Sequence, residues 1–194
     1  MTRKADRSHP ARRRSRQAPH ARHARHAGGA GPRPPRSKLL TLAKLLGALR
    51  QARRAGRIIV FTNGVFDLLH PGHVKLLARA RGMGDLLVVA VNSDASVRRL
   101  KGPDRPFVSQ RDRALMLASL EAVDYVVGFT QDTPLTLIER IQPDLLVKGG
   151  DWKSGAIVGK DLVESRGGRV VRVPVLEGFS TTKIARSVRA RRQV

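Results

Sequence analysis

The sequence predicts an α/β fold built on a largely parallel, five-stranded sheet, and three observations lead to this class. Short apolar or β-branched segments recur along the chain, segments of helical periodicity lie between them, and turn-forming residues separate the two kinds. Strands that alternate with helices form βαβ units with right-handed crossovers, so the sheet they build is mostly parallel. The predicted strands cover residues 58–61, 85–92, 125–129, 144–147 and 169–173.

Residues 39–56 precede the first strand and form a predicted amphipathic helix. Leucines recur at helical spacing from Leu39 to Leu49, and Gly56 ends the segment. The stretch is too short and too charged to span a bilayer, so we expect it to pack on the domain that follows. No other segment approaches transmembrane length, and we therefore expect no membrane insertion.

The stretch IIVFTNGVFDLLHPGH, residues 58–73, predicts a buried strand, a turn and the start of a helix near His70 and His73. The first turn of a helix presents unpaired N–H groups and the positive end of the helix dipole, which together bind phosphates. Gly72 would let a phosphate approach the backbone closely, and two histidines three residues apart could both donate hydrogen bonds to it. Taken alone, such a pair is more often a set of ordinary surface or metal-binding histidines.

The other connections between the predicted strands complete the expected topology. We expect a polar loop over residues 93–106, and then helices over 110–120, 134–141 and 180 to about 188. Ligands of parallel sheets bind beyond the carboxyl ends of the strands, so these connections should surround the functional site.

Residues 1–38 are predicted to form a disordered basic arm. The formal net charge is +23, much of it lies in this stretch, and Asp6 is the only acidic residue there. Such a composition offers too little apolar surface to offset the entropy of folding. The charge alone would indicate a nucleic-acid partner, but its concentration in the arm limits that prediction to the arm. Cysteine is absent, which excludes disulfides and thiolate chemistry and is compatible with a cytoplasmic protein.

Four sequence blocks in order resemble a known superfamily. Residues 65–73, together with the preceding Gly64, match the GxFDxxHxGH signature of the cytidylyltransferase-like nucleotidyltransferases, and residues 91–102, 145–152 and 177–184 match three further blocks. Together they resemble the nucleotidyltransferase domain of bacterial D-glycero-β-D-manno-heptose 1-phosphate adenylyltransferases. The resemblance implies a Rossmann-like three-layer sandwich over residues 57–190.

The resemblance also implies roles for individual residues. It gives a catalytic set of His70, His73, Lys101 and Arg113. Acceptor binding is expected of Asp67 and Asp94. Nucleotide binding is expected of Val65, Phe66, Gly72, Lys148, Gly149, Gly150, Asp151, Ser180, Thr181 and Thr182. No protein metal ligand is expected, because Mg²⁺ would bridge phosphate oxygens and keep mostly water and nucleotide as ligands.

Each of these positions also has a purely structural interpretation. Hydroxyl residues before a helix are usually N-caps, a Gly-Gly pair after a strand is usually a turn, and isolated aspartates often belong to turns. Asp124 is assigned a structural role alone. The matched position in a family block is what favours function at the other sites.

The predicted reaction is transfer of AMP from ATP to the heptose 1-phosphate, giving ADP-heptose for lipopolysaccharide or another surface glycan. One alternative is a cytidylyltransferase for glycerol 3-phosphate or a phospho-alcohol. Val175 and Leu176 stand where some CTP-using relatives place an arginine, which disfavours a close match to the glycerol-phosphate enzymes. Another alternative is a basic nucleic-acid-binding protein on a degenerate transferase scaffold. Relatives often form dimers, so a homodimer is possible. The bifunctional relatives carry a sugar kinase domain ahead of this one, which residues 1–38 could not supply.

Overall fold

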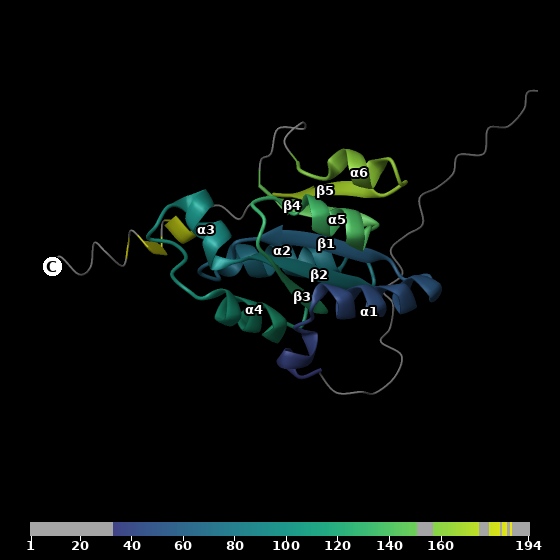
Figure 1. Ribbon diagram of the computed structural model, residues 1–194, viewed down its shortest axis with the longest axis horizontal. Helices are drawn as coiled ribbons and strands as arrows, with labels where there is room; N and C mark the ends of the chain where they lie inside the picture. Colours follow the sequence, from purple (N-terminus) through teal and green to yellow (C-terminus); the bar gives the residue numbers. More distant parts are fainter. Residues whose placement is uncertain (1–32, 151–156, 175–178, 183, 186, 188–194) are drawn as a thin grey trace, which may run out of the picture. The chain divides into compact units, whose positions relative to one another are not determined.

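A five-stranded parallel sheet forms the centre of the molecule (Figure 1). The computed structural model describes residues 33–150, 157–174, 179–182, 184, 185 and 187, so most of the predicted arm lies outside the described residues. The strands are β1 (Ile59–Gly64), β2 (Leu86–Asn92), β3 (Tyr125–Phe129), β4 (Leu145–Gly149) and β5 (Arg169–Val173). Every pairing between them is parallel, in the order β3-β2-β1-β4-β5. The predicted parallel sheet is therefore confirmed, with β1 at its middle.

Helices connect the strands and cover both faces of the sheet. A short 3₁₀ helix, η1 (Pro35–Lys38), comes first. The α-helices are α1 (Leu42–Arg54), α2 (Pro71–Arg81), α3 (Asp94–Lys101), α4 (Gln110–Ser119), α5 (Leu135–Ile141) and α6 (Lys160–Glu164). None of the helices in the described part of the chain combines the length and the apolar character needed to cross a bilayer.

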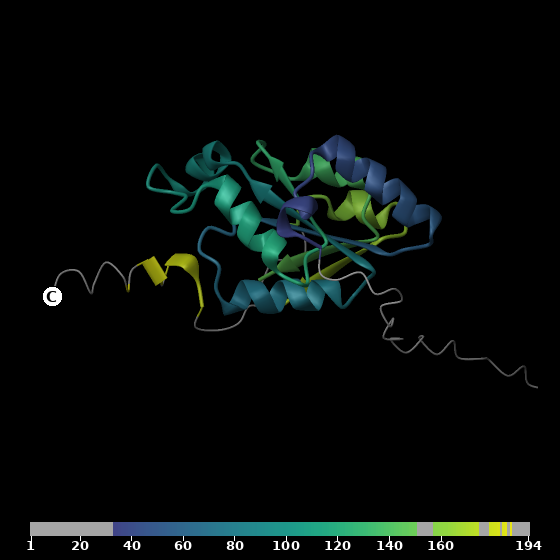
Figure 2. The ribbon, with the colours of Figure 1, turned by 90° about the horizontal axis from the view of Figure 1, so that it is seen from below.

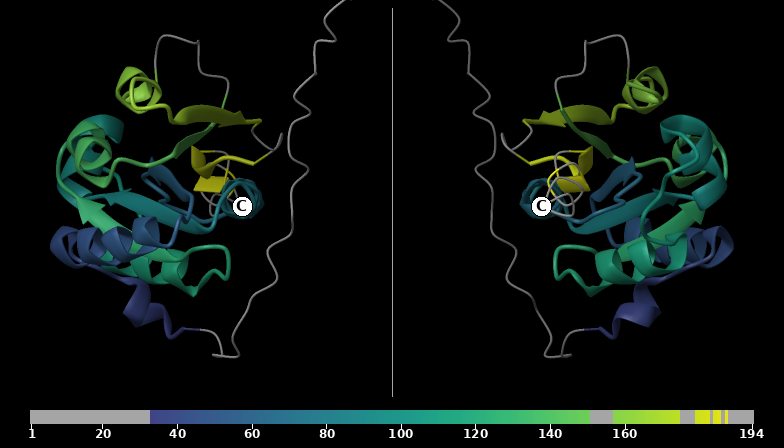
Figure 3. Two further views of the ribbon diagram at one scale, coloured as in Figure 1. Left: turned by 90° about the vertical axis from the view of Figure 1, so that its right-hand side faces the viewer. Right: turned by 90° about the vertical axis from the view of Figure 1, so that its left-hand side faces the viewer.

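Alternation along the strands divides the core into two halves. Ile59 and Phe61 of β1 face the half that also contains apolar residues of α1, α5 and α6. Val60 faces the other half, which contains Leu77 of α2 and Leu117 of α4. Figures 2 and 3 show α1 and α2 on opposite sides of the sheet. Since a strand buried on both faces must be apolar throughout, this three-layer arrangement explains the continuous apolar runs in β1 and β2.

The segment after β2 differs from the sequence prediction. Residues 94–101, expected as part of a polar loop, form the helix α3. Ser93 caps it, because its side chain accepts a hydrogen bond from the Ser96 N–H at 3.2 Å. Only one apolar side chain of this helix, Val97, is fully buried, so the sequence offers little helical periodicity. Of the expected closing helix, residues 181, 182, 184, 185 and 187 are described and are helical.

Residues 33–40 lie along the edge strand β3. Leu39 bridges to Val126, and the Leu40 N–H donates to the Val126 carbonyl at 3.0 Å. Arg33 and Lys38 donate to the backbone carbonyls of Asp124 and Leu120, at 2.7 and 3.0 Å. The sequence analysis placed residues 33–38 in the arm, whereas in the structure they contact the folded domain.

Three aspartates satisfy backbone groups at the amino ends of the strands. Asp85 accepts from the Ile58 N–H at 2.8 Å, and Asp144 accepts from the Ile59 N–H at 2.7 Å. Asp124 accepts from the Leu87 N–H at 2.8 Å. These carboxylates occupy the donors that the start of each strand leaves without a ladder partner, which agrees with the structural role expected for Asp124.

Candidate active site

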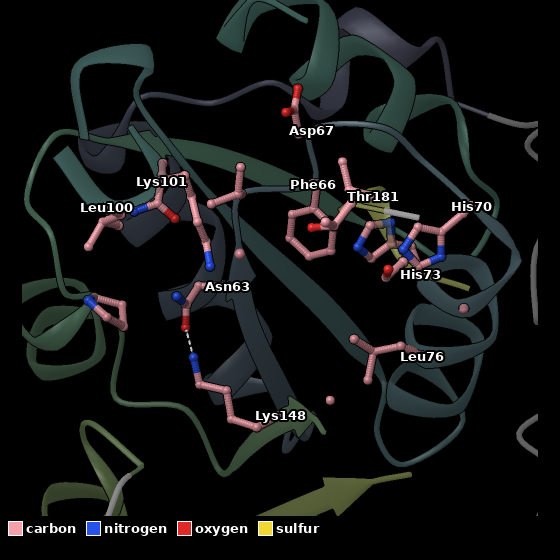
Figure 4. A pocket seen from close by; sticks show the side chains of 18 of the residues that line it. Asn63, Phe66, Asp67, His70, His73, Leu76, Leu100, Lys101, Lys148 and Thr181 are labelled. Atoms are coloured by element: carbon pink, nitrogen blue, oxygen red, sulfur yellow. Dashed lines mark hydrogen bonds between the residues drawn. The ribbon is translucent and has the colours of Figure 1, made fainter. Parts of the chain in front are cut away.

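A cavity of about 640 Å³ opens at the carboxyl ends of the strands (Figure 4). The sequence-predicted residues that line it are Val65, Phe66, Asp67, His70, Gly72, His73, Lys101, Lys148, Gly149, Ser180, Thr181 and Thr182. Asp94, Arg113 and Gly150 do not line it, and Asp151 lies outside the described residues. The topology therefore gathers one site from segments more than 100 residues apart in the sequence.

The two histidines stack at the start of α2. Their ring centroids lie 3.8 Å apart with an interplanar angle of 21°. His70 is the N-cap residue of the helix and does not cap it through its side chain. Its Nδ1 atom is buried and, within the described part of the chain, has no hydrogen-bond partner. Both rings line the cavity at the start of α2, where the N–H groups of His73 and Val74 donate to the His70 carbonyl at 2.9 and 3.3 Å.

Burial keeps both histidines neutral near neutral pH. It lowers the pKa of His70 below the ordinary value of 6.5. For His73, burial and the adjacent His70 ring lower the pKa to about 4, against an opposing effect of the Leu68 backbone. A neutral imidazole carries one N–H donor and one acceptor nitrogen. The pair therefore brings hydrogen-bond donors to the cavity without a formal charge.

A strained turn at Phe66 packs against the histidine pair. Phe66 has φ of 50°, a left-handed conformation that is rare outside glycine and costs of order 1–3 kcal/mol. This conformation buries the Phe66 ring, which meets the His73 ring edge-on at a centroid distance of 5.2 Å. A Cβ atom on Gly64 would lie 3.1 Å from the same ring, so a larger residue at Gly64 would crowd it. The turn thus fixes the position of the His73 ring and, through stacking, that of the His70 ring.

The carboxylate of Asp67, predicted to bind the acceptor, is engaged by the protein itself. It accepts hydrogen bonds from the N–H groups of Phe107 and Val108, at 2.7 and 3.1 Å. Its second oxygen pairs with Nε of Arg105 at 2.8 Å. The Arg105 guanidinium lies over the Phe107 ring, 4.4 Å from its centroid. Asp67 therefore holds the 105–108 loop beside the cavity that it lines, and acceptor binding by this carboxylate stays a prediction.

Arg113, predicted as a catalytic residue, is fully buried and does not line the cavity. Its guanidinium donates to the carbonyls of Val108, Val65 and Asn92. It also pairs with the Asp94 carboxylate at 2.6 Å. The structure therefore engages Arg113, which lies outside the cavity lining, with Asp94 and with three backbone carbonyls, and a direct contact of Arg113 or Asp94 with substrate stays a prediction. Arg113 holds the ends of β1 and β2 and the 105–108 loop together.

Lys148 enters the cavity from the end of β4. Its ammonium group donates to the side-chain oxygen of Asn63, at the end of the neighbouring strand β1 (Figure 4). Burial lowers the pKa of Lys148 to about 8. The adjacent Gly149 lies so close to Leu76 of α2 that a Cβ atom there would be 3.0 Å from its methyl group. Gly150 adopts φ of 113°, which requires glycine.

Asn63 and Arg105 are among the polar residues of the cavity wall that were not predicted. Asn63 holds Lys148, and Arg105 lies between Asp67 and Phe107. Asn63 lies in the stretch 58–73 and Arg105 in the expected polar loop 93–106, yet their side-chain chemistry alone does not single them out. For Asn63 the available signal was its position, because it ends a buried strand that leads directly to the histidine motif.

Comparison with known proteins identifies the family. A family model described as cytidylyltransferase-like matches residues 61–187. The chain belongs to this family. The resemblance expected from the four sequence blocks is therefore confirmed, and the Rossmann-like α/β sandwich is the fold of a cytidylyltransferase-like protein.

Curated relatives match most of this chain and a smaller part of their own length. The bifunctional protein HldE of Syntrophotalea carbinolica is 56% identical over 147 residues, which are 76% of this chain and 30% of the relative. That of Geotalea uraniireducens is 54% identical over 152 residues, or 78% of this chain and 31% of the relative. The chain thus spans less than a third of the length of these relatives.

One solved structure extends the comparison to three dimensions. It is described as the lipopolysaccharide core biosynthesis protein from Thermoplasma volcanium GSS1, and it is 28% identical to this chain. The superposition covers 64% of this chain and all of the other, with a TM-score of 0.52.

Proposed function

We propose that this cytidylyltransferase-like protein transfers AMP from ATP to D-glycero-β-D-manno-heptose 1-phosphate and releases pyrophosphate. The observation that carries the proposal is that one cavity is lined both by the stacked, uncharged histidines at the start of α2 and by the Ser180–Thr182 segment. Family membership supports nucleotidyl transfer. The heptose substrate is supported by the four sequence blocks and by relatives at 51–56% identity named bifunctional protein HldE.

The proposed reaction requires positioning and stabilisation of negative charge. A phosphate oxygen of the acceptor attacks the α-phosphorus of ATP, and the bond to the bridging oxygen breaks so that pyrophosphate leaves with the electron pair. No covalent enzyme intermediate is needed. His70 and His73 would donate hydrogen bonds to the α-phosphoryl oxygens, where charge develops in the transition state. Because the rings are held by Phe66 and by each other, they would need little reorganisation during the reaction.

The β- and γ-phosphates are proposed to lie toward the segment 180–182, and Lys101 is proposed to reach the phosphates from the side of the cavity where Asn63 lies (Figure 4). Lys101 ends α3 and is exposed, so its ammonium group is free to reach a phosphate as a point charge. Ser180, Thr181 and Thr182 line the cavity at the start of the closing helix. Hydroxyls and N–H groups at such a position bind phosphate oxygens well. Thr181 and the two histidines lie near each other in Figure 4.

Mg²⁺ is proposed to arrive with ATP. Among the described residues, no group of three or more histidine, aspartate or glutamate side chains could hold a metal ion. Of the carboxylates that line the cavity, Asp67 is bound by Arg105 and Asp132 is bound by Arg99 at 2.7 Å. Phosphate oxygens and water would therefore supply most ligands of the ion, which would neutralise part of the phosphate charge.

Pyrophosphate release by the purified protein tests the proposal. The assay compares ATP with CTP, each in the presence of Mg²⁺, against the heptose 1-phosphate, glycerol 3-phosphate and no acceptor. The expected result is release with ATP and the heptose 1-phosphate alone. Release with CTP and glycerol 3-phosphate would assign the cytidylyltransferase function instead, while absence of release with every pair would refute nucleotidyl transfer to both acceptors.

A further inference from the structure

We propose that Lys148, held in place by Asn63, binds the phosphate group of the acceptor. The inference rests on the proposed nucleotidyl transfer, which brings a second anionic substrate into the cavity beside ATP. It assigns Lys148 to the acceptor instead of to the nucleotide, and it adds Asn63 as a positioning residue.

Lys148 is a half-buried cation with no carboxylate partner among the described residues. Its ammonium group donates to the amide oxygen of Asn63, and no salt bridge of Lys148 occurs in the described part of the chain. The two aspartates of the cavity wall are already paired with Arg105 and Arg99. Burying a charge without an opposite charge is costly, as the lowered pKa of Lys148 reflects. An anionic ligand would remove this cost.

Asn63 orients the Lys148 ammonium group by accepting one of its hydrogen bonds. An ammonium group has three donors, and the amide oxygen of Asn63 accepts one of them. The remaining donors lie on a side chain that lines the cavity. Because β1 and β4 are neighbouring strands, the backbone fixes the separation of Asn63 and Lys148. The pair is therefore a preorganised donor whose orientation does not depend on a loop.

The position of the pair favours the acceptor over the triphosphate. In Figure 4, Asn63 and Lys148 lie across the cavity from His70, His73 and Thr181, which are proposed to bind the triphosphate. In an in-line displacement the attacking and leaving oxygens lie on opposite sides of the phosphorus. If pyrophosphate leaves on the histidine and Thr181 side, the attacking phosphate must approach from the other side. Lys148 is a cation on that side.

Steady-state kinetics of a charge-deleting variant test the assignment. Lys148→Met keeps an unbranched side chain of similar length, and replacing a buried charge by an apolar group is often tolerated. We expect it to raise KM for the acceptor roughly 10- to 100-fold, the range for loss of a hydrogen bond to a charged group, while KM for ATP changes by less than about twofold. Lys160→Met is the matched control, because Lys160 of α6 is half-exposed, pairs with Glu164 and does not line the cavity.

A second variant tests the positioning role of Asn63. Asn63→Asp keeps the shape of the side chain but supplies Lys148 with the counter-charge that it lacks. We expect the acceptor KM to rise, because the new carboxylate neutralises Lys148 and repels the incoming phosphate. A purely structural role of Asn63 would change thermal stability and leave the ratio of the two KM values unaltered.

A binding measurement separates this inference from the proposed reaction. Side-chain NMR of ¹⁵N-lysine-labelled protein would follow the Lys148 ammonium, identified by its absence from the Lys148→Met spectrum. The protein is first saturated with α,β-methylene-ATP and then titrated with the acceptor that supports turnover, or with inorganic phosphate if none does. We expect the pKa of Lys148 to rise from about 8 only in the second step.

The outcomes of these measurements are distinct. A response of Lys148 to α,β-methylene-ATP alone, or a Lys148→Met variant with a raised KM for ATP, would assign the lysine to the nucleotide and overturn the inference. No response in either step would also overturn it. Failure of the heptose 1-phosphate in the turnover assay would refute the proposed substrate, while a Lys148 response to phosphate in the second step would still support the anion subsite.

Discussion

The two ends of the sheet differ in whether their ionisable groups have partners in the fold. At the amino end, Asp85, Asp124 and Asp144 each accept a hydrogen bond from a strand N–H, and Asp124 also pairs with Arg81 at 2.8 Å. At the carboxyl end, His70, His73 and Lys148 have lowered pKa values and, within the described residues, no carboxylate partner.

The difference indicates what each end contributes. Paired groups at the amino end stabilise the fold, since their hydrogen bonds are already made. The unpaired groups at the carboxyl end are held ready by Phe66 and Asn63 and are available to a ligand. Perturbed ionisable groups in a cavity are the usual mark of a functional site. Substitutions at the two ends should therefore affect different quantities.

Arg113 lies near the carboxyl end of the sheet but is paired. It therefore tests whether pairing, rather than location, decides if a substitution lowers stability or turnover. We expect Arg113→Met to lower the free energy of unfolding by about 3–5 kcal/mol, because it removes one partner of a buried ion pair and leaves three carbonyls without their donor. Chemical denaturation measures this loss. A stable variant whose turnover alone is lost would show that Arg113 acts on the substrate after all.

The histidines should show the reverse pattern. We expect His73→Ala, and likewise His70→Ala, to lower turnover by on the order of a hundredfold or more, as removal of a transition-state donor does. The free energy of unfolding should change less than in Arg113→Met, since neither imidazole has a carboxylate partner among the described residues. Pyrophosphate release and denaturation are measured on the same preparations, and near-normal turnover in either variant would remove the proposed role.

Asp144 provides the matched variant at the amino end. We expect Asp144→Ala to cost about 2 kcal/mol of unfolding free energy, because the Ile59 N–H loses a charge-assisted hydrogen bond of 2.7 Å. Turnover at a temperature where the variant remains folded should match the unaltered protein. A large selective loss of turnover would mean that the two ends are coupled.

The pH dependence of the histidine pair sharpens the comparison further. NMR titration should place the pKa of His73 at about 4, well below 6.5, and it should rise in His70→Ala because burial decreases and the neighbouring ring is lost. Between pH 6.5 and 4 the unfolded chain binds a proton that folded His73 does not. Stability should therefore fall as the pH is lowered through this window. An unshifted titration of His73 would contradict the assignment.

The smallest effect is expected at the N-terminus. Deleting residues 1–32 should leave turnover nearly intact, because the described site draws no residue from them. A longer deletion, of residues 1–38, should lower the melting temperature by a few degrees, since it also removes the contacts of Arg33 and Lys38 with Asp124 and Leu120. Loss of turnover in the shorter deletion, with the fold intact, would place the arm in the site.

Much of the architecture could be predicted from the sequence because burial on both faces leaves a clear signal. The apolar runs identified all five strands, and residues 125–129 and 169–173 matched their observed bounds. The helix α3 was missed because it buries little apolar surface. The histidine cavity was also predicted, since the carboxyl ends of parallel strands converge whatever their loops contain.

The sequence by itself determined the parallel sheet, the family and a set of candidate site residues, because these follow from periodicity and from motifs read along the chain. Only the tertiary structure decided which of those residues remain available to a ligand. Arg113 and Asp67 carry the charges expected of a site, yet their partners come from loops distant in sequence. Lys148 lacks such a carboxylate partner among the described residues, and that distinction depends on contacts that exist only once the strands are assembled.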